Sequence, residues 1–101
     1  MKINFNQPIF DFTTGKQLPR PDAEEGATLE WLTVTALKMP VDQPTPLLIM
    51  ARYDLIKKIH GAAGPVSLTA EQVASIKELI VKAFQSPLVC GTALELLEGE
   101  E

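Results

Sequence analysis

The sequence predicts a mainly α-helical protein of the α+β class, in which an N-terminal β-hairpin is followed by about four short helices packed as a compact bundle. Three observations lead to this prediction: alternating apolar and polar residues near the start, apolar residues at helical spacing in the remainder, and capping residues or prolines between the helical stretches. We expect a hairpin over residues 1–18, a loop over 19–27, a helical region over 28–98 and an acidic tail over 99–101. With 101 residues, the chain has the length of a single domain.

The first strand of the hairpin is indicated by a period of two. Ile3, Phe5 and Ile9 are separated from one another by even intervals, and polar residues stand between them. Pro8 has no backbone N–H to donate to a sheet. This strand is therefore expected either to lie at an edge or to be broken at Pro8.

The return strand follows a turn signal at residues 13–16, with the sequence TTGK. Residues 17–18 complete the predicted hairpin. A two-stranded hairpin has little stability of its own in water, so it must pack on the rest of the protein. Phe5, Phe10 and Phe12 are the side chains expected to do so.

The first helix is predicted from residue 29 to about residue 39. Thr28 stands where an N-cap residue belongs, and Pro40 ends the helical pattern. Glu30 in the first turn and Lys38 in the last turn have the charges that the helix dipole favours at those ends.

The second helix is predicted to begin after Thr45, with Pro46 in the first helical position. It extends to about His60, and Gly61 suits the C-terminal cap. Its expected buried stripe consists of Leu48, Ala51, Leu55, Ile56 and Ile59.

The third helix carries the clearest local signal, because Thr69 and Gln72 have the spacing of a capping box. A last helix is expected after Ser86, with Pro87 in its first position, and to end near residue 98. Gly91 lies inside this helix at a cost of about 1 kcal/mol relative to alanine. We interpret Gly91 as a contact point at which another backbone approaches closely.

Composition limits the chemistry that the chain can perform. Nine Lys and Arg against thirteen Asp and Glu give a net charge of −4, and there is one cysteine and one histidine. A disulfide within the chain and a cysteine-based zinc site are excluded. No apolar run approaches the roughly 18 residues that a membrane span requires, and no secretory signal is expected. We expect no metal, no cofactor and no membrane association.

A small thiol-dependent enzyme built on Cys90 and His60 is one alternative. Cys90 lies near the start of the last predicted helix, close to the positive end of the helix dipole, and His60 is the only imidazole that could serve as its base. The simpler interpretation is that Cys90 is a small buried side chain and His60 a histidine at a helix end.

A nucleic-acid-binding regulator of the helix-turn-helix type is a second alternative, since the helices over 70–84 and 87–98 follow closely on one another. The second of them contains no Lys and no Arg. Affinity for nucleic acid depends on cations that neutralise phosphates, so this alternative is disfavoured.

Three large apolar residues exceed what the predicted core requires, namely Trp31, Leu47 and Met50. A small protein gains stability when such groups are buried against a partner. We therefore place Trp31, Leu47 and Met50 at a candidate protein interface, although Trp31 also suits the edge of the core. Catalytic, cofactor-binding and metal-binding residues are not predicted.

Across nearly its whole length the sequence resembles a group of small proteins encoded by tailed phages and prophages. The resemblance rests on MKINF at residues 1–5, RYDLIKKI at 52–59, SLTAEQV at 67–73, SPLV at 86–89 and ALELLEG at 93–99. That group has no assigned activity, so the resemblance implies a phage origin and a place in the bacterial cytoplasm but transfers no catalytic residue. We expect a non-enzymatic accessory protein that acts as a small interaction module on a phage protein, a host protein or a second copy of itself.

Overall fold

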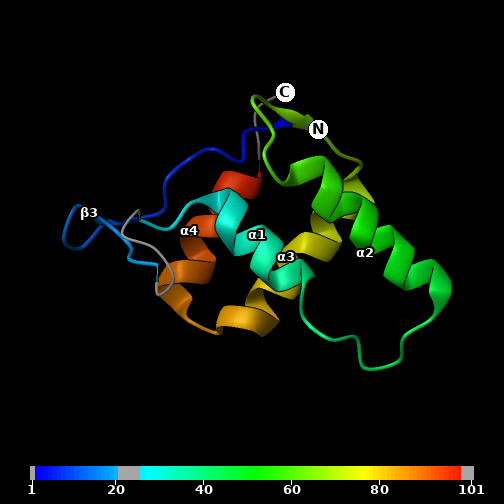
Figure 1. Cartoon of the computed structure of the whole chain (residues 1–101). Coiled ribbons are helices and arrows are strands. Elements are labelled where there is room, and N and C mark those ends of the chain that lie inside the picture. Colours follow the sequence, from blue (N-terminus) through cyan, green and yellow to red (C-terminus); the bar gives the residue numbers. More distant parts are fainter. Residues whose placement is uncertain (1, 21–25, 99–101) are drawn as a thin grey trace.

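The computed structural model of the chain describes residues 2–20 and 26–98 and confirms the predicted fold class (Figure 1). Part of the predicted loop, residues 21–25, and the predicted acidic tail over 99–101 lie outside the described residues. The elements in chain order are β1 (Lys2–Ile3), β2 (Phe10–Asp11), β3 (Lys16–Gln17), α1 (Leu29–Leu37), α2 (Pro46–Ile59), β4 (Val66–Ser67), α3 (Ala70–Phe84) and α4 (Pro87–Leu97).

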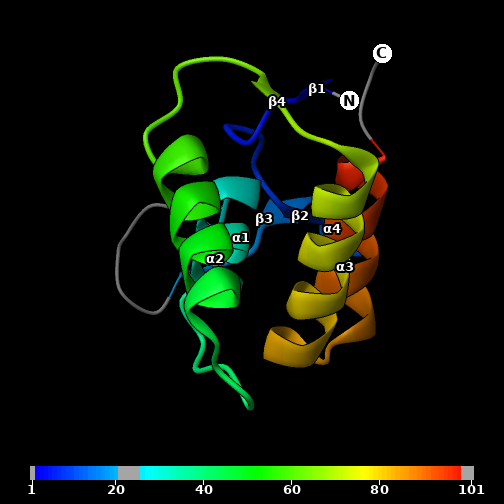
Figure 2. The ribbon, with the colours of Figure 1, turned by 90° about the vertical axis from the view of Figure 1, so that its right-hand side faces the viewer.

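Helix α1 occupies the centre of the fold, with α2, α3 and α4 all in contact with it (Figure 2). Six of its nine residues are apolar and occur on all sides of the helix, a pattern typical of a buried helix. The buried residues of α1 are Leu29, Leu32, Thr33, Val34, Ala36 and Leu37.

The N-terminal segment satisfies the first backbone amides of this buried helix. The N–H of Leu29 donates to the carbonyl of Gln7 at 2.9 Å, and the N–H of Glu30 donates to the carbonyl of Phe5 at 2.8 Å. Such amides have no partner within their own helix, and leaving them unpaired in a core is unfavourable. Residues 5–7 therefore cap α1 from outside the helix.

Thr28 supplies the next bond, as predicted, because its side chain accepts from the N–H of Trp31 at 3.2 Å. Thr45 caps α2 in the same way, accepting from the N–H of Leu48 at 3.2 Å, but its surroundings are exposed to solvent. Water can replace the exposed hydrogen bond of Thr45 more easily than the partly buried hydrogen bond of Thr28. The two threonines therefore form a matched pair for comparing a partly buried cap with an exposed one.

We predict that Thr28→Ala lowers the free energy of unfolding by about 1–2 kcal/mol, whereas Thr45→Ala lowers it by about 0.5 kcal/mol. Urea denaturation followed by circular dichroism measures both. An equal loss for the two variants would contradict the central place given to the start of α1.

Thr33 is the one polar residue among the fully buried side chains of the described core. Its hydroxyl oxygen has no hydrogen-bond partner among the residues that the structure describes. A buried hydroxyl without a partner is unfavourable, and valine has nearly the same shape without that cost.

We predict that Thr33→Val raises the free energy of unfolding by about 1 kcal/mol. Thr33→Ser keeps the hydroxyl and removes a methyl group, so it should lower the same quantity. Thermal and urea unfolding of the two variants provide the comparison, and a loss of stability in the valine variant would contradict the assignment.

The predicted first strand is not continuous. Only β2 and β3 form the hairpin, with Phe10 opposite Gln17 and Asp11 opposite Lys16. β1 pairs instead with β4, more than sixty residues later in the chain, with Ile3 opposite Val66 (Figure 2). The chain turns at residues 5–6, and the carbonyls of Phe5 and Gln7 accept from α1 rather than from a sheet.

The hairpin turn is fixed by Asp11 and Gly15. The Asp11 carboxylate accepts from the hydroxyl and from the N–H of Thr13, and these hydrogen bonds hold the pKa of Asp11 below its usual range. Gly15 has a φ of +73°, which a glycine adopts without strain. Both features agree with the turn expected at residues 13–16.

The phenylalanine prediction is correct for Phe5 and wrong for the other two. Phe5 is fully buried, whereas Phe10 is 47% exposed and Phe12 is 79% exposed. The hairpin extends sideways from the helices, and of its two strands β2 is the one that packs against α4 (Figure 1). The two exposed rings therefore contribute little to the core.

The remaining caps agree with the sequence, with one exception. Thr69 and Gln72 form the complete capping box of α3, and Gly61 adopts a φ of +73° after the end of α2. Ser86 stands at the N-cap of α4 but makes no side-chain capping bond. Its position before Pro87 was sufficient to begin the helix, because proline is favoured in the first helical position.

Gly91 is exposed on α4, and a Cβ atom added there would meet no atom within 4 Å. The interpretation of Gly91 as a close packing contact is therefore wrong. The position faces a hollow between the hairpin and α4, lined also by Phe10 and Phe12.

We predict that Gly91→Ala raises the free energy of unfolding by up to about 1 kcal/mol, because alanine favours the helix and the Cβ has room. Urea denaturation measures the change. A destabilised variant would mean that the hollow beside α4 is filled in solution.

Candidate functional site

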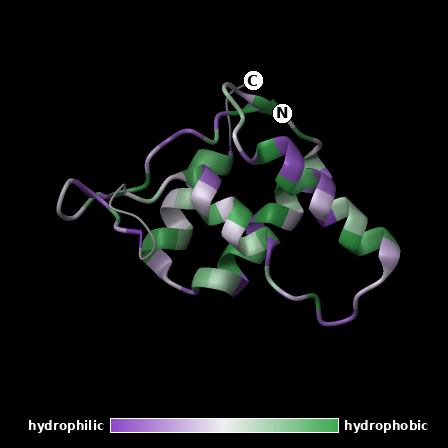
Figure 3. Cartoon of the chain, in the orientation of Figure 1, coloured by the Kyte–Doolittle hydropathy of each residue, from purple (hydrophilic) through white to green (hydrophobic). Residues whose placement is uncertain are grey.

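Helix α2 lies at the edge of the molecule in two perpendicular views (Figures 1 and 2). Of its fourteen residues only Leu55 and Ile59 are buried, and both belong to its second half. The first eight residues of the helix carry large apolar side chains in contact with solvent: Leu47 is 83% exposed, Met50 51% and Tyr53 52%. Figure 3 shows the hydrophobic colour of this part of the helix.

A proline-rich connector leads into the exposed first half of α2. Residues 40–45 contain Pro40 and Pro44 and form neither helix nor strand. Figure 1 shows this connector in a wide arc between the end of α1 and the start of α2. The predicted buried stripe of α2 is therefore wrong in its first half, where Leu48 and Ala51 are exposed.

One side of α2 points directly away from the core. Successive residues of a helix are rotated by about 100°, so Met50 lies opposite Leu55 and Ile59. Residues three, four and seven positions from Met50 share its side. We call this surface the outward face of α2; it consists of Pro46, Leu47, Met50, Tyr53, Asp54 and Lys57, all of which are exposed.

The outward face is apolar at its start and charged toward its end. The ammonium group of Lys57 lies 5.2 Å from the centre of the Tyr53 ring. Such a cation–π contact holds the ring and the charge together at the surface. Asp54 and Lys57 give this end of the face both signs of charge.

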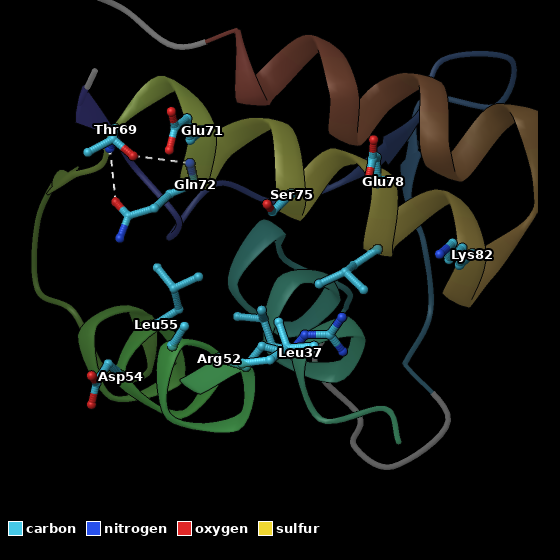
Figure 4. Close-up of a pocket in the computed structure, with 13 residues that line it drawn as sticks. Leu37, Arg52, Asp54, Leu55, Thr69, Glu71, Gln72, Ser75, Glu78 and Lys82 are labelled. Carbon is cyan, nitrogen blue, oxygen red and sulfur yellow. Dashed lines mark hydrogen bonds between the residues drawn. The ribbon is translucent and has the colours of Figure 1, made fainter. Parts of the chain in front are cut away.

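On its other side α2 borders a groove, which we call the α2–α3 groove (Figure 4). Both helices pack on α1, and the open space between them has a volume of about 510 Å³. Leu37 of α1 and Leu55 of α2 lie between the two helices in the close-up. The apolar part of the lining consists of Leu37, Leu48, Ala51, Leu55 and Leu79.

The charges around the α2–α3 groove do not favour one class of ligand. Arg52 and Lys82 are cationic and Glu71 and Glu78 are acidic, while Asp54 lies on the rim that the groove shares with the outward face. Glu71 belongs to the first turn of α3, where the helix dipole favours an acid. The groove therefore has a mixed rim rather than a set of polar groups directed at one point.

The structure brings Leu47 and Met50 together and places Trp31 elsewhere. Trp31 is partly buried. The centre of its ring lies 5.8 Å from the centre of the Phe84 ring, and the Arg20 guanidinium lies 5.6 Å from the centre of the Trp31 ring. The interpretation of Trp31 as a residue at the edge of the core is confirmed. Tyr53 was not assigned to the interface from the sequence, although its spacing of three from Met50 was a usable signal.

Cys90 and His60 have separate surroundings. Cys90 is buried in α4, and its sulfur lies 3.7 Å from the carbonyl oxygen of Ile80. His60 is exposed after the end of α2, in a shallow hollow that it shares with Arg20, Trp31 and other residues of α1. The interpretation of Cys90 as a small buried side chain is confirmed.

Helices α3 and α4 lie side by side and run in opposite directions (Figure 2). They form an antiparallel helical hairpin rather than the crossed pair of a helix-turn-helix unit. In residues 2–20 and 26–98, no group of three or more His, Cys, Asp or Glu side chains could hold a metal ion. Within the same residues, no helix combines the length and the apolar character needed to cross a membrane.

No family model, curated protein or solved structure matches this chain. The functional argument is therefore carried by the surface that the fold leaves open. That surface is the outward face of α2, where large apolar side chains are exposed without any contribution to the core.

Proposed function

We propose that this chain is a non-enzymatic accessory protein of a phage or prophage and acts as a small protein-interaction module. The observation that carries the proposal is the exposure of Leu47, Met50 and Tyr53 on one side of α2. Contiguous apolar patches are uncommon on soluble monomers and mark surfaces that bind a partner. Removing such side chains from water contributes about 25 cal/mol for each Å² that is buried.

The type of partner follows from the chemistry of the face. An apolar centre with charges of both signs at one end is typical of a protein–protein contact. Nucleic acid is a poor partner for a chain with a net charge of −4 and a cation-free last helix. The partner is a phage protein, a host protein or a second copy of the chain, and the interaction needs no cofactor.

The phage origin is supported by the resemblance of the sequence to small proteins of tailed phages and prophages. That origin implies action in the cytoplasm of a bacterial host. The single cysteine, which is buried and unpaired, is compatible with a reducing compartment.

We predict that the double variant Leu47→Ser, Met50→Ser loses at least tenfold in affinity for its protein partner, because the centre of the apolar contact is removed. The measurement is affinity capture from a lysate of an infected bacterial host, followed by titration of the captured protein. Both substitutions are at exposed positions, so the circular dichroism spectrum and the free energy of unfolding should change little.

Phe12→Ser with Val81→Ser is the matched control, since both residues are exposed and apolar but lie on β-hairpin and α3 surfaces. This control should retain binding. If the control loses binding and the α2 variant does not, the interaction surface is not on α2. If the wild-type chain shows neither capture of a protein nor self-association, the proposed function is wrong.

A further inference from the structure

We propose that the outward face of α2 binds the same face of a second copy of the chain. The two α2 helices lie antiparallel, and the two Met50 side chains meet at the two-fold axis. This inference rests on the proposed function and names its partner. It follows from the order of residues on the outward face and from the charges at its two ends.

The outward face is self-complementary about Met50. When two helices run antiparallel about residue 50, each residue lies opposite the one that is equally far from Met50 in the other direction. Leu47 then lies opposite Tyr53 of the second copy, and Pro46 lies opposite Asp54. The large apolar side chains meet one another in both halves, as a two-fold interface requires.

The charges favour the same arrangement. The first turn of α2 contains no acidic residue, and its exposed amide end carries the positive pole of the helix dipole. Asp54 is exposed two turns further on, too far from this end to act on it. In the antiparallel pair, Asp54 of each copy lies beside the first turn of α2 in the other copy. An acidic side chain is then present at the amide end of both helices.

A parallel pair is disfavoured by the same residues. It would place Asp54 beside Asp54 and Lys57 beside Lys57, and like charges in contact repel each other. In the antiparallel pair, Lys57 and Lys58 instead approach the segment that precedes α2 in the second copy. That segment contains the exposed Asp42, so opposite charges face one another at both ends.

The outward face is accessible to a second copy. Both perpendicular views place α2 at the edge of the molecule, with the other helices on its inner side. One face of a short helix buries less than the roughly 800 Å² per partner of a standard interface. We therefore expect an association of moderate strength, with a dissociation constant on the order of 10–100 µM.

Cysteine cross-linking tests the geometry. Under mild oxidation Met50→Cys should form a covalent dimer, because the two residues meet at the axis. Lys58→Cys is the matched control on the same helix: in the antiparallel pair the two copies of residue 58 are about 24 Å apart, so no cross-link should form. Cys90 is buried and is present in both variants, so any cross-linking through Cys90 is the same in both.

Sedimentation equilibrium from about 5 to 500 µM tests the energetics. The wild-type chain should shift from monomer to dimer, and Asp54→Asn should weaken the dimer about threefold to thirtyfold, because two helix-end interactions are lost. Glu71→Gln, an exposed acid on α3 in the α2–α3 groove, should leave the dissociation constant unchanged.

Four outcomes would overturn this inference. One is a monomer at every concentration together with no covalent dimer of Met50→Cys; another is efficient cross-linking of Lys58→Cys, which means a parallel pair. The third is a monomer that binds vesicles of anionic lipid through Leu47, which means that a lipid surface covers the face. A monomer whose Leu47 and Met50 still capture a different protein overturns the inference and leaves the proposed function intact.

Discussion

The burial of α1 is the constraint on which the rest of the structure depends. A helix of nine residues with apolar side chains distributed around it is stable only when other elements enclose it. The first backbone amides must also find acceptors, and they do so at the carbonyls of Phe5 and Gln7 and at Thr28. The irregular path of the N-terminal segment is a consequence of this need, because a regular strand would have used those carbonyls in a sheet.

The exposed face of α2 follows from the same constraint. Helix α1 is about 13 Å long and α2 about 21 Å, so α1 can cover only part of its neighbour. The end of α2 is fixed at the start of α1, where the Glu30 carboxylate accepts from the N–H of Gly61. Leu55 and Ile59 therefore reach the core, and the excess length, with Leu47 and Met50, extends beyond it.

Local features of the fold could be predicted from the sequence, whereas pairings between distant segments could not. The capping box of Thr69 and Gln72 and the turn at residues 13–16 depend on neighbouring residues alone, and both are present. The pairing of β1 with β4 depends on where α1 and α3 bring two remote segments together. No periodicity near residue 3 contains that information.

At the candidate site, too, local features could be predicted from the sequence and contacts between distant segments could not. Apolar residues at helical spacing indicate which side of a helix can be buried, but not whether the fold provides a neighbour at every turn. For Leu48 and Ala51 no neighbour covers the stripe, so the predicted burial is wrong. Leu47 and Met50 were identified because they exceed the needs of the core, and Trp31 met the same criterion although Phe84 covers part of it.

The two halves of α2 therefore have different physical roles. The second half stabilises the fold, since Leu55 and Ile59 belong to the hydrophobic core. The first half contributes little to that core, so its apolar residues are not explained by folding. Exposed apolar residues also increase the tendency of a protein to aggregate. Among these exposed residues, Leu47, Met50 and Tyr53 lie together on the outward face, away from the core, and an interaction that the folded chain makes after it has formed explains this placement best.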